Sequence, residues 1–233
     1  MEIIPVIDLL HGKVVRAQRG ERERYLPIRS QLCASCEPLE ITRALTELYP
    51  FNTLYIADLN AIQGMGNNVA EIIKLHHHFP HLDFWVDSGI ASANTWPYPR
   101  ASNIRCIIGS EALNSIDQYT HLLSELATVQ PILSLDFNRN GLLGPEALLQ
   151  PEYWPHKLIC MTLTRVGSYE GPDFEKIAEL AATNPRREIY AAGGIRGIAD
   201  LKRLRVLGAA GALIASTLHD GKIDASMLAE LMA

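Results

Sequence analysis

Residues 86–90 read Val-Asp-Ser-Gly-Ile, and residues 191–195 read Ala-Ala-Gly-Gly-Ile. Both stretches are the end of an apolar run followed by a turn of small residues, and they lie 105 residues apart. Two more pairs repeat at offsets of 106 and 104: Ile107–Ser110 with Leu213–Ser216, and Leu54–Ile56 with Leu158–Cys160. Self-similarity at a fixed offset indicates a repeated structural unit. The sequence therefore predicts two similar halves.

Eight short apolar runs along the chain are predicted strands. They are Ile3–Ile7, Leu54–Ala57, Phe84–Val86, Cys106–Ile108, Ile132–Leu135, Leu158–Met161, Ile189–Ala191 and Ala212–Ile214. Five segments with apolar residues at helical spacing lie between them: Pro38–Leu48, Val69–His77, Ile116–Ala127, Asp173–Ala182 and Ile198–Leu207. Continuous apolar strands are typical of a parallel sheet covered on both faces. Because the strands number eight and no GxGxxG follows the first, we expect residues 1–233 to form one domain, a closed (β/α)8 (TIM) barrel of two (β/α)4 half-barrels.

Two aspartates follow matched strands in the two halves. Asp8 ends Pro5–Asp8, and Asp136 ends Leu133–Asp136 at an offset of 128. The larger offset is explained by a long first loop, roughly Ala17–Glu37, which we expect to lie over the active face. Strands one and five lie opposite each other in the barrel, so the two carboxylates could act as general base and general acid across one cavity. The alternative is that each is an ordinary turn or capping residue.

Small-residue turns follow strands three, four, seven and eight. They contain Ser88 and Gly89, Gly109 and Ser110, Gly193 and Gly194, and Ala215 and Ser216. Glycine lets the backbone approach an oxyanion, and free N–H groups at a helix start bind phosphate. The duplication predicts a ligand with a phosphate at each end, unless these are simply tight turns. Arg196 could donate two hydrogen bonds to a phosphate or be a solvated helix residue.

Composition excludes several functional classes. The formal charge is −5, with 48% hydrophobic and 20% charged residues, so no basic field attracts nucleic acid. No apolar run is long enough for a membrane span, and the N-terminus lacks the basic region of a signal peptide. Four cysteines, including Cys33 and Cys36, do not form a secreted disulfide framework. We expect a cytoplasmic monomer or small homo-oligomer.

Nearly the whole chain resembles the histidine-biosynthesis HisA/HisF barrel family. The N-terminal IIPVIDLLHGKVVRAQRG is similar to that family's strand-one signature, and YIADLNAIQG, IIGSEALN, SLDF, GSYEGPDFEKI, YAAGGIRGIADLKRL and ALIASTLHDGKI are similar to later strands and turns. Val6 and Arg16 resemble the isomerase (HisA) branch. The resemblance implies an Amadori-type aldose–ketose isomerase acting on a phosphorylated ribosyl substrate, with Asp8 as base and Asp136 as acid. It implies phosphate binding near Gly167 and no metal or organic cofactor.

The sequence departs from the family pattern at some turns. Strand three lacks the usual glycine triplet and arginine, Met161 stands at the strand-six threonine, and Val166 replaces an aspartate. These departures keep two alternatives open. One is a related barrel enzyme for another phosphorylated metabolite, for example in one-carbon cofactor biosynthesis. The other is a non-catalytic protein that binds a phosphorylated metabolite.

Overall fold

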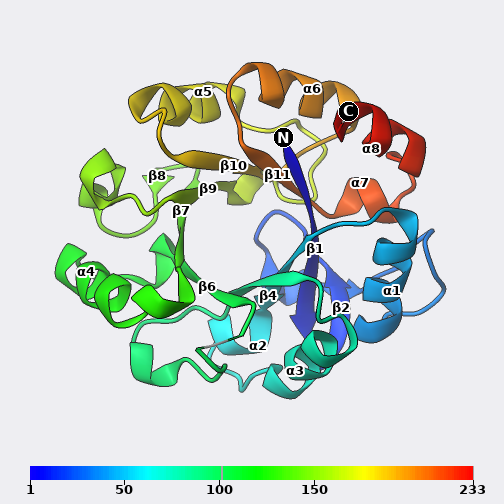
Figure 1. Ribbon diagram of the computed structural model, residues 1–233, viewed down its shortest axis with the longest axis horizontal. Helices are drawn as coiled ribbons and strands as arrows, with labels where there is room; N and C mark the ends of the chain where they lie inside the picture. Colours follow the sequence, from blue (N-terminus) through cyan, green and yellow to red (C-terminus); the bar gives the residue numbers. More distant parts are fainter. Residues whose placement is uncertain (101, 233) are drawn as a thin grey trace.

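Eight parallel strands close into a barrel in the computed structural model, which describes residues 1–100 and 102–232. In barrel order they are β1 (Glu2–Leu10), β4 (Thr53–Asp58), β5 (Asp83–Asp87), β6 (Ile104–Gly109), β7 (Ile132–Asn138), β9 (Lys157–Thr162), β10 (Glu188–Ala192) and β11 (Gly211–Ile214). Parallel pairing of β11 with β1 closes the ring, and all eight predicted strands lie in it. Figure 1 looks along the barrel, with the first half in the lower part of the view and the second above. The predicted (β/α)8 fold is confirmed.

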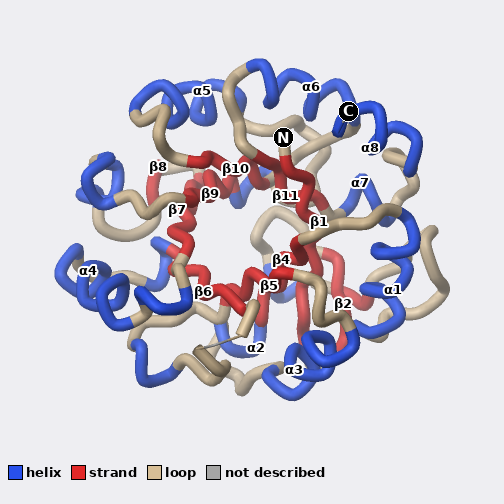
Figure 2. The backbone as a smooth tube through the Cα atoms, viewed as in Figure 1, coloured by secondary structure: helices blue, strands red, loops and turns tan. Residues whose placement is uncertain are grey.

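Helices surround the ring of strands (Figure 2). They are α1 (Pro38–Leu48), α2 (Leu59–Ile62), α3 (Val69–His78), α4 (Ile116–Glu125), α5 (Phe174–Thr183), α6 (Ile198–Val206), α7 (Ser216–His219) and α8 (Ala225–Met232). Asp173 caps α5, as its position predicts, by accepting a 3.1 Å hydrogen bond from the amide of Lys176. After β5 and β7 the outer layer is built of 3-10 turns: η2 (Ala93–Thr95) in one unit, and η5 (Glu146–Leu149) and η6 (Pro151–Tyr153) in the other. No helix in the described residues has the length and apolar character needed to cross a bilayer.

Alternation along each strand separates an inner core from an outer one. The inner core contains Tyr55, Trp85, Ile159 and Tyr190, whereas their strand neighbours pack outward against the helices. Side chains along a strand point alternately to its two faces. Asp8, Asp87 and Asp136 are each an even number of residues from an inner-core residue of their strand, so they point into the barrel. Each of these aspartates lies toward the C-terminal end of its strand.

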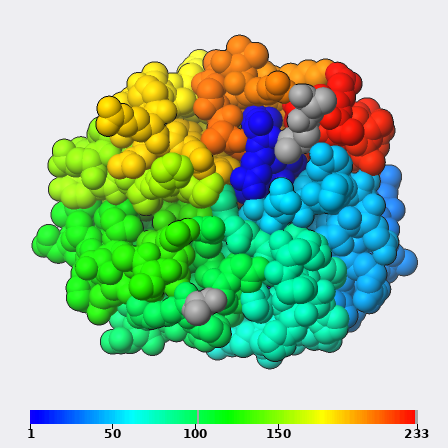
Figure 3. All heavy atoms as spheres, in the orientation of Figure 1, coloured from blue at the N-terminus to red at the C-terminus, as the bar shows by residue number. Residues whose placement is uncertain are grey.

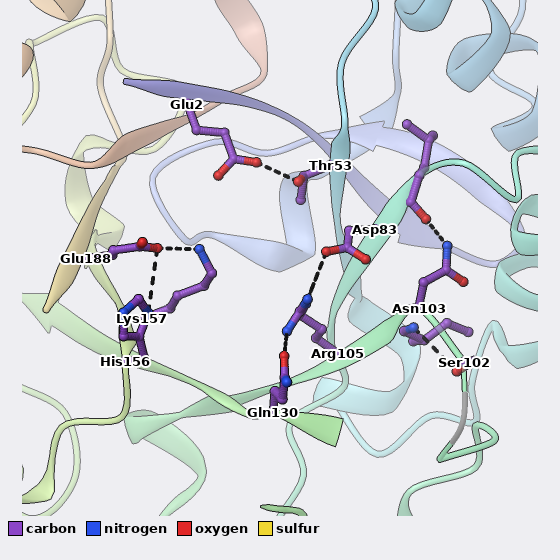
Figure 4. A network of polar contacts seen from close by, with 12 residues as sticks. Glu2, Thr53, Asp83, Ser102, Asn103, Arg105, Gln130, His156, Lys157 and Glu188 are labelled. Atoms are coloured by element: carbon purple, nitrogen blue, oxygen red, sulfur yellow. Dashed lines mark hydrogen bonds and ion pairs between the residues drawn. The ribbon is translucent and has the colours of Figure 1, made fainter. Parts of the chain in front are cut away.

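A polar network closes the N-terminal end of the barrel (Figure 4). Thr53 donates a 2.6 Å hydrogen bond to Glu2, and Arg105 pairs with Asp83 at 3.1 Å. Lys157 pairs with Glu188, and its ammonium group lies 5.0 Å from the centre of the Tyr190 ring. In Figure 3 the N-terminal segment of β1 is at the surface of this face, between the two halves.

The long first loop contains a small ribbon that folds back against β1. Strand β2 (Lys13–Arg16) pairs antiparallel with β1, and β3 (Leu26–Pro27) pairs with β2. The turn η1 (Arg22–Arg24) connects β2 and β3. Four shorter elements complete the chain: β8 (Gly141–Leu142), η3 (Ser110–Ala112), η4 (Ala127–Val129) and η7 (Leu163–Arg165). The ribbon lies over the C-terminal end of the barrel, where we expected the loop to be.

Candidate active site

A cavity of about 380 Å³ lies at the C-terminal end of the barrel. Three aspartates line it, Asp8 on β1, Asp87 on β5 and Asp136 on β7, together with Glu111 on η3. This is the face on which barrel enzymes carry their active sites. The structure therefore brings the two predicted aspartates to one cavity and adds a third.

Asp136 is held by a dense set of hydrogen bonds. Ser134 donates to its Oδ1 at 2.7 Å, while the Ser110 hydroxyl and the Glu111 amide donate to Oδ2 at 3.3 and 3.2 Å. Burial, together with the neighbouring charge of Asp87, nevertheless raises the pKa of Asp136 to about 7. The Asp136 side chain is thus fixed in place and close to half protonated at neutral pH.

Asp8 has a different environment. Its carboxylate receives no side-chain hydrogen bond from the described residues, and burial raises its pKa to about 7. The positive charge of Arg22 opposes this rise, and Asp87 adds to it. Burial is the largest influence on both aspartates. The largest charge effect on Asp8 is that of the Arg22 cation, which favours the ionised form, whereas on Asp136 it is that of the Asp87 carboxylate, which favours the protonated form.

Asp87 is a site residue that the sequence analysis missed. Tyr55 donates a 3.2 Å hydrogen bond to its Oδ2, and the Gly89 amide donates at 3.0 Å to its Oδ1. Burial raises the pKa of Asp87 to about 6. A β-carbon on Gly109 would lie 3.3 Å from Asp136 Oδ2 and 3.9 Å from Asp87 Oδ2, so this glycine leaves room for both carboxylates.

Three arginines of the first loop connect it to the rim of the barrel. Arg16 makes two hydrogen bonds to Asp220, at 2.8 and 2.6 Å. Arg19 pairs with Glu170 at 2.8 Å, and its amide donates to Val166. The third, Arg22, pairs with Glu111. All three arginines line the cavity.

The second-half turns form part of the cavity wall. Gly167, Gly193, Gly194, Ala215 and Ser216 all line it. Within residues 1–100 and 102–232, the amides of Gly167, Gly193, Gly194 and Ser216 donate no hydrogen bond to the protein. A β-carbon on Gly193 would lie 2.6 Å from the carbonyl oxygen of Thr162, and its φ of +100° also requires glycine. These turns leave donors available to a bound anion.

The first-half turns are placed differently. Ser88, Gly89, Gly109 and Ser110 are not among the described residues that line the cavity. These turns support the aspartates of the site instead: the Gly89 amide donates a hydrogen bond to Asp87, and the Ser110 hydroxyl donates one to Asp136.

Arg196 also lies away from the cavity. The residue is exposed, and its guanidinium makes two hydrogen bonds to Asp200, at 2.9 and 2.7 Å. The guanidinium of Arg196, which we considered as a phosphate ligand, is therefore already hydrogen-bonded to Asp200.

The described part of the chain shows no group of three or more His, Cys, Asp or Glu side chains arranged to hold a metal ion. Cys33 and Cys36 are free thiols in the first loop. His78 ends α3, where its Nδ1 contacts the carbonyl oxygen of Lys74 at 2.8 Å.

The sequence profile of the family described as "Histidine biosynthesis protein" matches residues 2–224. The chain belongs to this family. An uncharacterised protein of Methanocaldococcus jannaschii, 34% identical over 229 residues, covers 96% of both chains.

Other relatives in the histidine biosynthesis family have a named activity. A protein of Thermoanaerobacter sp. named 1-(5-phosphoribosyl)-5-((5-phosphoribosylamino)methylideneamino)imidazole-4-carboxamide isomerase is 27% identical over 245 residues, 96% of this chain and 97% of its own. The protein of the same name from Methanopyrus kandleri is 26% identical over 250 residues, 99% and 97% of the two chains. These two relatives are named as isomerases, and their identity to this chain is lower than that of the uncharacterised archaeal protein.

Proposed function

We propose that this protein is a HisA-like aldose–ketose isomerase acting on a phosphorylated ribosyl substrate. The observation that carries the proposal is the pair Asp8 and Asp136, which line one cavity from β1 and β7. An Amadori-type rearrangement needs one group to protonate the ring oxygen and another to remove the proton from C2. Two carboxylates on one cavity satisfy that need when one is ionised and the other protonated.

The surroundings of the two aspartates support the assignment of roles. Asp8 is the proposed general base, since the nearby charge of Arg22 favours its ionised form. Asp136 is the proposed general acid, since Asp87 beside it favours its protonated form. In the reaction Asp136 gives its proton to the ring oxygen as the C1–O bond breaks, and the resulting iminium is neutralised when Asp8 takes the C2 proton. The enaminol then tautomerises to the aminoketose.

We assign the substrate's phosphate to the second-half turns. Gly193, Gly194 and Ser216 line the cavity, together with Gly167, and none of their amides donates a turn or loop hydrogen bond within the described residues. Arg16 and Arg19, unlike Arg196, line the cavity, whereas their partners Asp220 and Glu170 do not, so a bound phosphate would exchange with these carboxylates for the two guanidinium groups. Backbone donors and flexible cations together are the usual ligands of a phosphomonoester.

The test is turnover of the aminoaldose ribotide by the full chain, followed by the change in its absorbance or NMR spectrum. Asp8→Asn and Asp136→Asn should each lower kcat by about 10²–10⁴-fold, the usual contribution of a positioned acid or base. Asp117→Asn, on the exposed first turn of α4, is the matched control and should leave kcat unchanged. Unchanged turnover in Asp8→Asn would refute the proposal.

A second candidate is a barrel enzyme acting on a different phosphorylated metabolite. It is favoured by the first-half rim, where Glu111 and Asp87 line the cavity and the amide of Gly89 is already bonded. Full rescue of an isomerase-deficient, histidine-requiring strain by this gene would exclude it. Saturable binding of ribotides without any turnover would instead indicate a non-catalytic binding protein.

A further inference from the structure

The two halves of the barrel present different chemistry at matched positions of the cavity wall. At the offset of 105, Asp87 in the first half corresponds to Ala192 in the second. At the offset of 106, Glu111 corresponds to Thr217. All four residues line the cavity. Each difference places a carboxylate in the first half where the second half has an uncharged side chain.

The backbone amides of the matched turns also differ between the two halves, because those of the first half are already hydrogen-bonded to carboxylates. In the first half the Gly89 amide donates to Asp87 at 3.0 Å, and the Glu111 amide donates to Asp136 at 3.2 Å. Their second-half counterparts are Gly194 and Thr217, whose amides donate to no described group of the protein. The first-half turns therefore use their donors to hold carboxylates and leave fewer for a ligand.

The charges lining the cavity are also distributed unevenly. Each lining arginine forms an ion pair, Arg16 with Asp220, Arg19 with Glu170 and Arg22 with Glu111. Only in the pair on the first-half side does the carboxylate, that of Glu111, line the cavity as well. A second phosphate at this end would have to remove Arg22 from Glu111 and then lie beside Asp87. His219 lines the cavity but stays neutral at pH 7, because burial lowers its pKa to about 4. No other lining residue in the described chain supplies a positive charge at this end.

We infer that the substrate carries a single phosphate, bound at the second-half turns, and a basic nitrogen at its other end, bound between Asp87 and Glu111. The inference rests on the proposed function, because it concerns the same cavity, and it narrows the substrate class to amine-bearing phosphomonoesters. An ammonium group is the complement of a wall with more carboxylates than cations.

A cation is favoured over a neutral hydroxyl because the aspartates of the cavity are buried close to one another, so each carboxylate that ionises adds negative charge beside the others. Asp8 receives no side-chain hydrogen bond from a described residue, although its carboxylate faces the cavity. Burial raises the pKa of Asp87 to about 6 and that of Asp136 to about 7. A bound ammonium group between Asp87 and Glu111 would favour the ionised form of Asp87, so binding should release protons.

Binding of three hexose phosphates to the full chain tests the inference by isothermal titration calorimetry. Glucosamine 6-phosphate and glucose 6-phosphate differ only in an amine against a hydroxyl, and glucose 1,6-bisphosphate adds the second phosphate. The amine should bind about tenfold more tightly than the hydroxyl, as expected for one charged hydrogen bond. The bisphosphate should bind most weakly. Titrations in buffers of different ionisation enthalpy should show proton release only for the amine.

Two variants replace first-half residues with their second-half counterparts. Glu111→Thr releases Arg22 to bind an anion, so it should remove the preference for the amine and increase bisphosphate affinity by about tenfold. Asp87→Ala should remove the amine preference without improving bisphosphate binding. Glu111→Gln, which keeps the size of the side chain, should behave like Glu111→Thr toward the amine. Asp117→Asn on α4 is the control and should retain the wild-type order.

The outcomes separate this inference from the proposed function. Bisphosphate binding that equals or exceeds that of the amine in the wild type overturns the inference, as does equal or weaker binding of glucosamine 6-phosphate than of glucose 6-phosphate. Neither result affects the isomerase proposal, which depends on loss of turnover in Asp8→Asn. Conversely, an amine preference with unchanged turnover in Asp8→Asn would support the binding assignment and refute the isomerase.

Discussion

Arg22 and Glu111 form an ion pair that connects the first loop to the rim of the barrel after β6. Their side chains are 27% and 26% exposed, so the pair is partly shielded from water. Burial opposes the charge of Arg22, but Glu111 overcomes this and raises the pKa of the guanidinium. Arg22 thus stays charged beside the cavity and acts on Asp8 as well as on its partner.

Replacing Arg22 should change the ionisation of the proposed base. Arg22→Met removes the cation that lowers the pKa of Asp8, so the acidic limb of the kcat/KM profile should move to higher pH by about one unit. Arg24→Met is a matched control, because Arg24 belongs to the same turn but its side chain is 73% exposed and pairs with Glu21. A shift of the same size in both variants would contradict a specific effect on Asp8.

Replacing Asp87 should move the profile in the opposite direction. The charge of Asp87 raises the pKa of both Asp8 and Asp136. Asp87→Asn should therefore shift both limbs of the bell to lower pH, by about one unit. The profile is measured as kcat/KM from pH 5 to 9, with Asp83→Asn at the other end of β5 as the control. A kcat/KM profile that stays at its wild-type position on the pH axis would show that the charge of Asp87 does not act on Asp8 or Asp136.

The buried carboxylates should reduce stability at neutral pH. The pKa of Asp8 is raised from 3.8 to about 7, so the folded state holds a proton that the unfolded chain releases. The stability this provides is complete below about pH 4 and is lost as the pH rises to 7. Asp8→Asn should consequently increase the free energy of unfolding at pH 8, by at most ~4 kcal/mol. Urea unfolding at pH 8 and pH 4 tests this, and an equal gain at both values would be inconsistent with titration of Asp8.

Much of the fold follows from the period and repetition of the sequence. Strand alternation places Asp8 and Asp136 at inner positions, and the loop after β2 is long enough to cover the barrel. The third and fifth outer helices were not predicted, and the structure has 3-10 turns in their place. Apolar spacing predicts a helix only where an amphipathic segment is long enough, and these two segments are not.

The site was less predictable because it depends on which groups meet in space. Asp87 stands in a turn that the repeat equates with Ala192-Gly193-Gly194, where the pattern predicts a small residue and gives no sign of a site carboxylate. Asp87 lies two residues after Trp85 in β5, so both side chains are on the same face of the strand. That spacing is the signal that could have identified Asp87 as an inner residue. No local pattern predicts that Arg22 meets Glu111, 89 residues away. The phosphate roles of Ser88, Gly89, Gly109 and Ser110 stay predictions.

A β-carbon at Gly193 should disturb both the fold and the anion site. It would lie 2.6 Å from the Thr162 carbonyl oxygen at a φ of +100°, so Gly193→Ala should destabilise the protein by about 1–3 kcal/mol. The turn must move to relieve the contact, which should also weaken inorganic phosphate as an inhibitor. Gly197→Ala is the control, since its β-carbon would meet nothing within 4 Å. Full phosphate affinity in Gly193→Ala would exclude this turn from the anion site.

The N-terminal network should contribute to stability without affecting catalysis. Lys157 pairs with Glu188, and its ammonium group lies 5.6 Å from the centre of the Trp85 ring and 5.0 Å from that of Tyr190. Lys157→Met loses the ion pair and the cation–π contacts, so the free energy of unfolding should fall by about 1–2 kcal/mol. Lys157 does not line the cavity at the C-terminal end, and kcat/KM should stay at the wild-type value. Glu188→Gln in the Lys157→Met background should add little further loss, because the ion pair is already absent. A fall in kcat/KM at a temperature where the variant is fully folded would show that the two ends of the barrel are coupled.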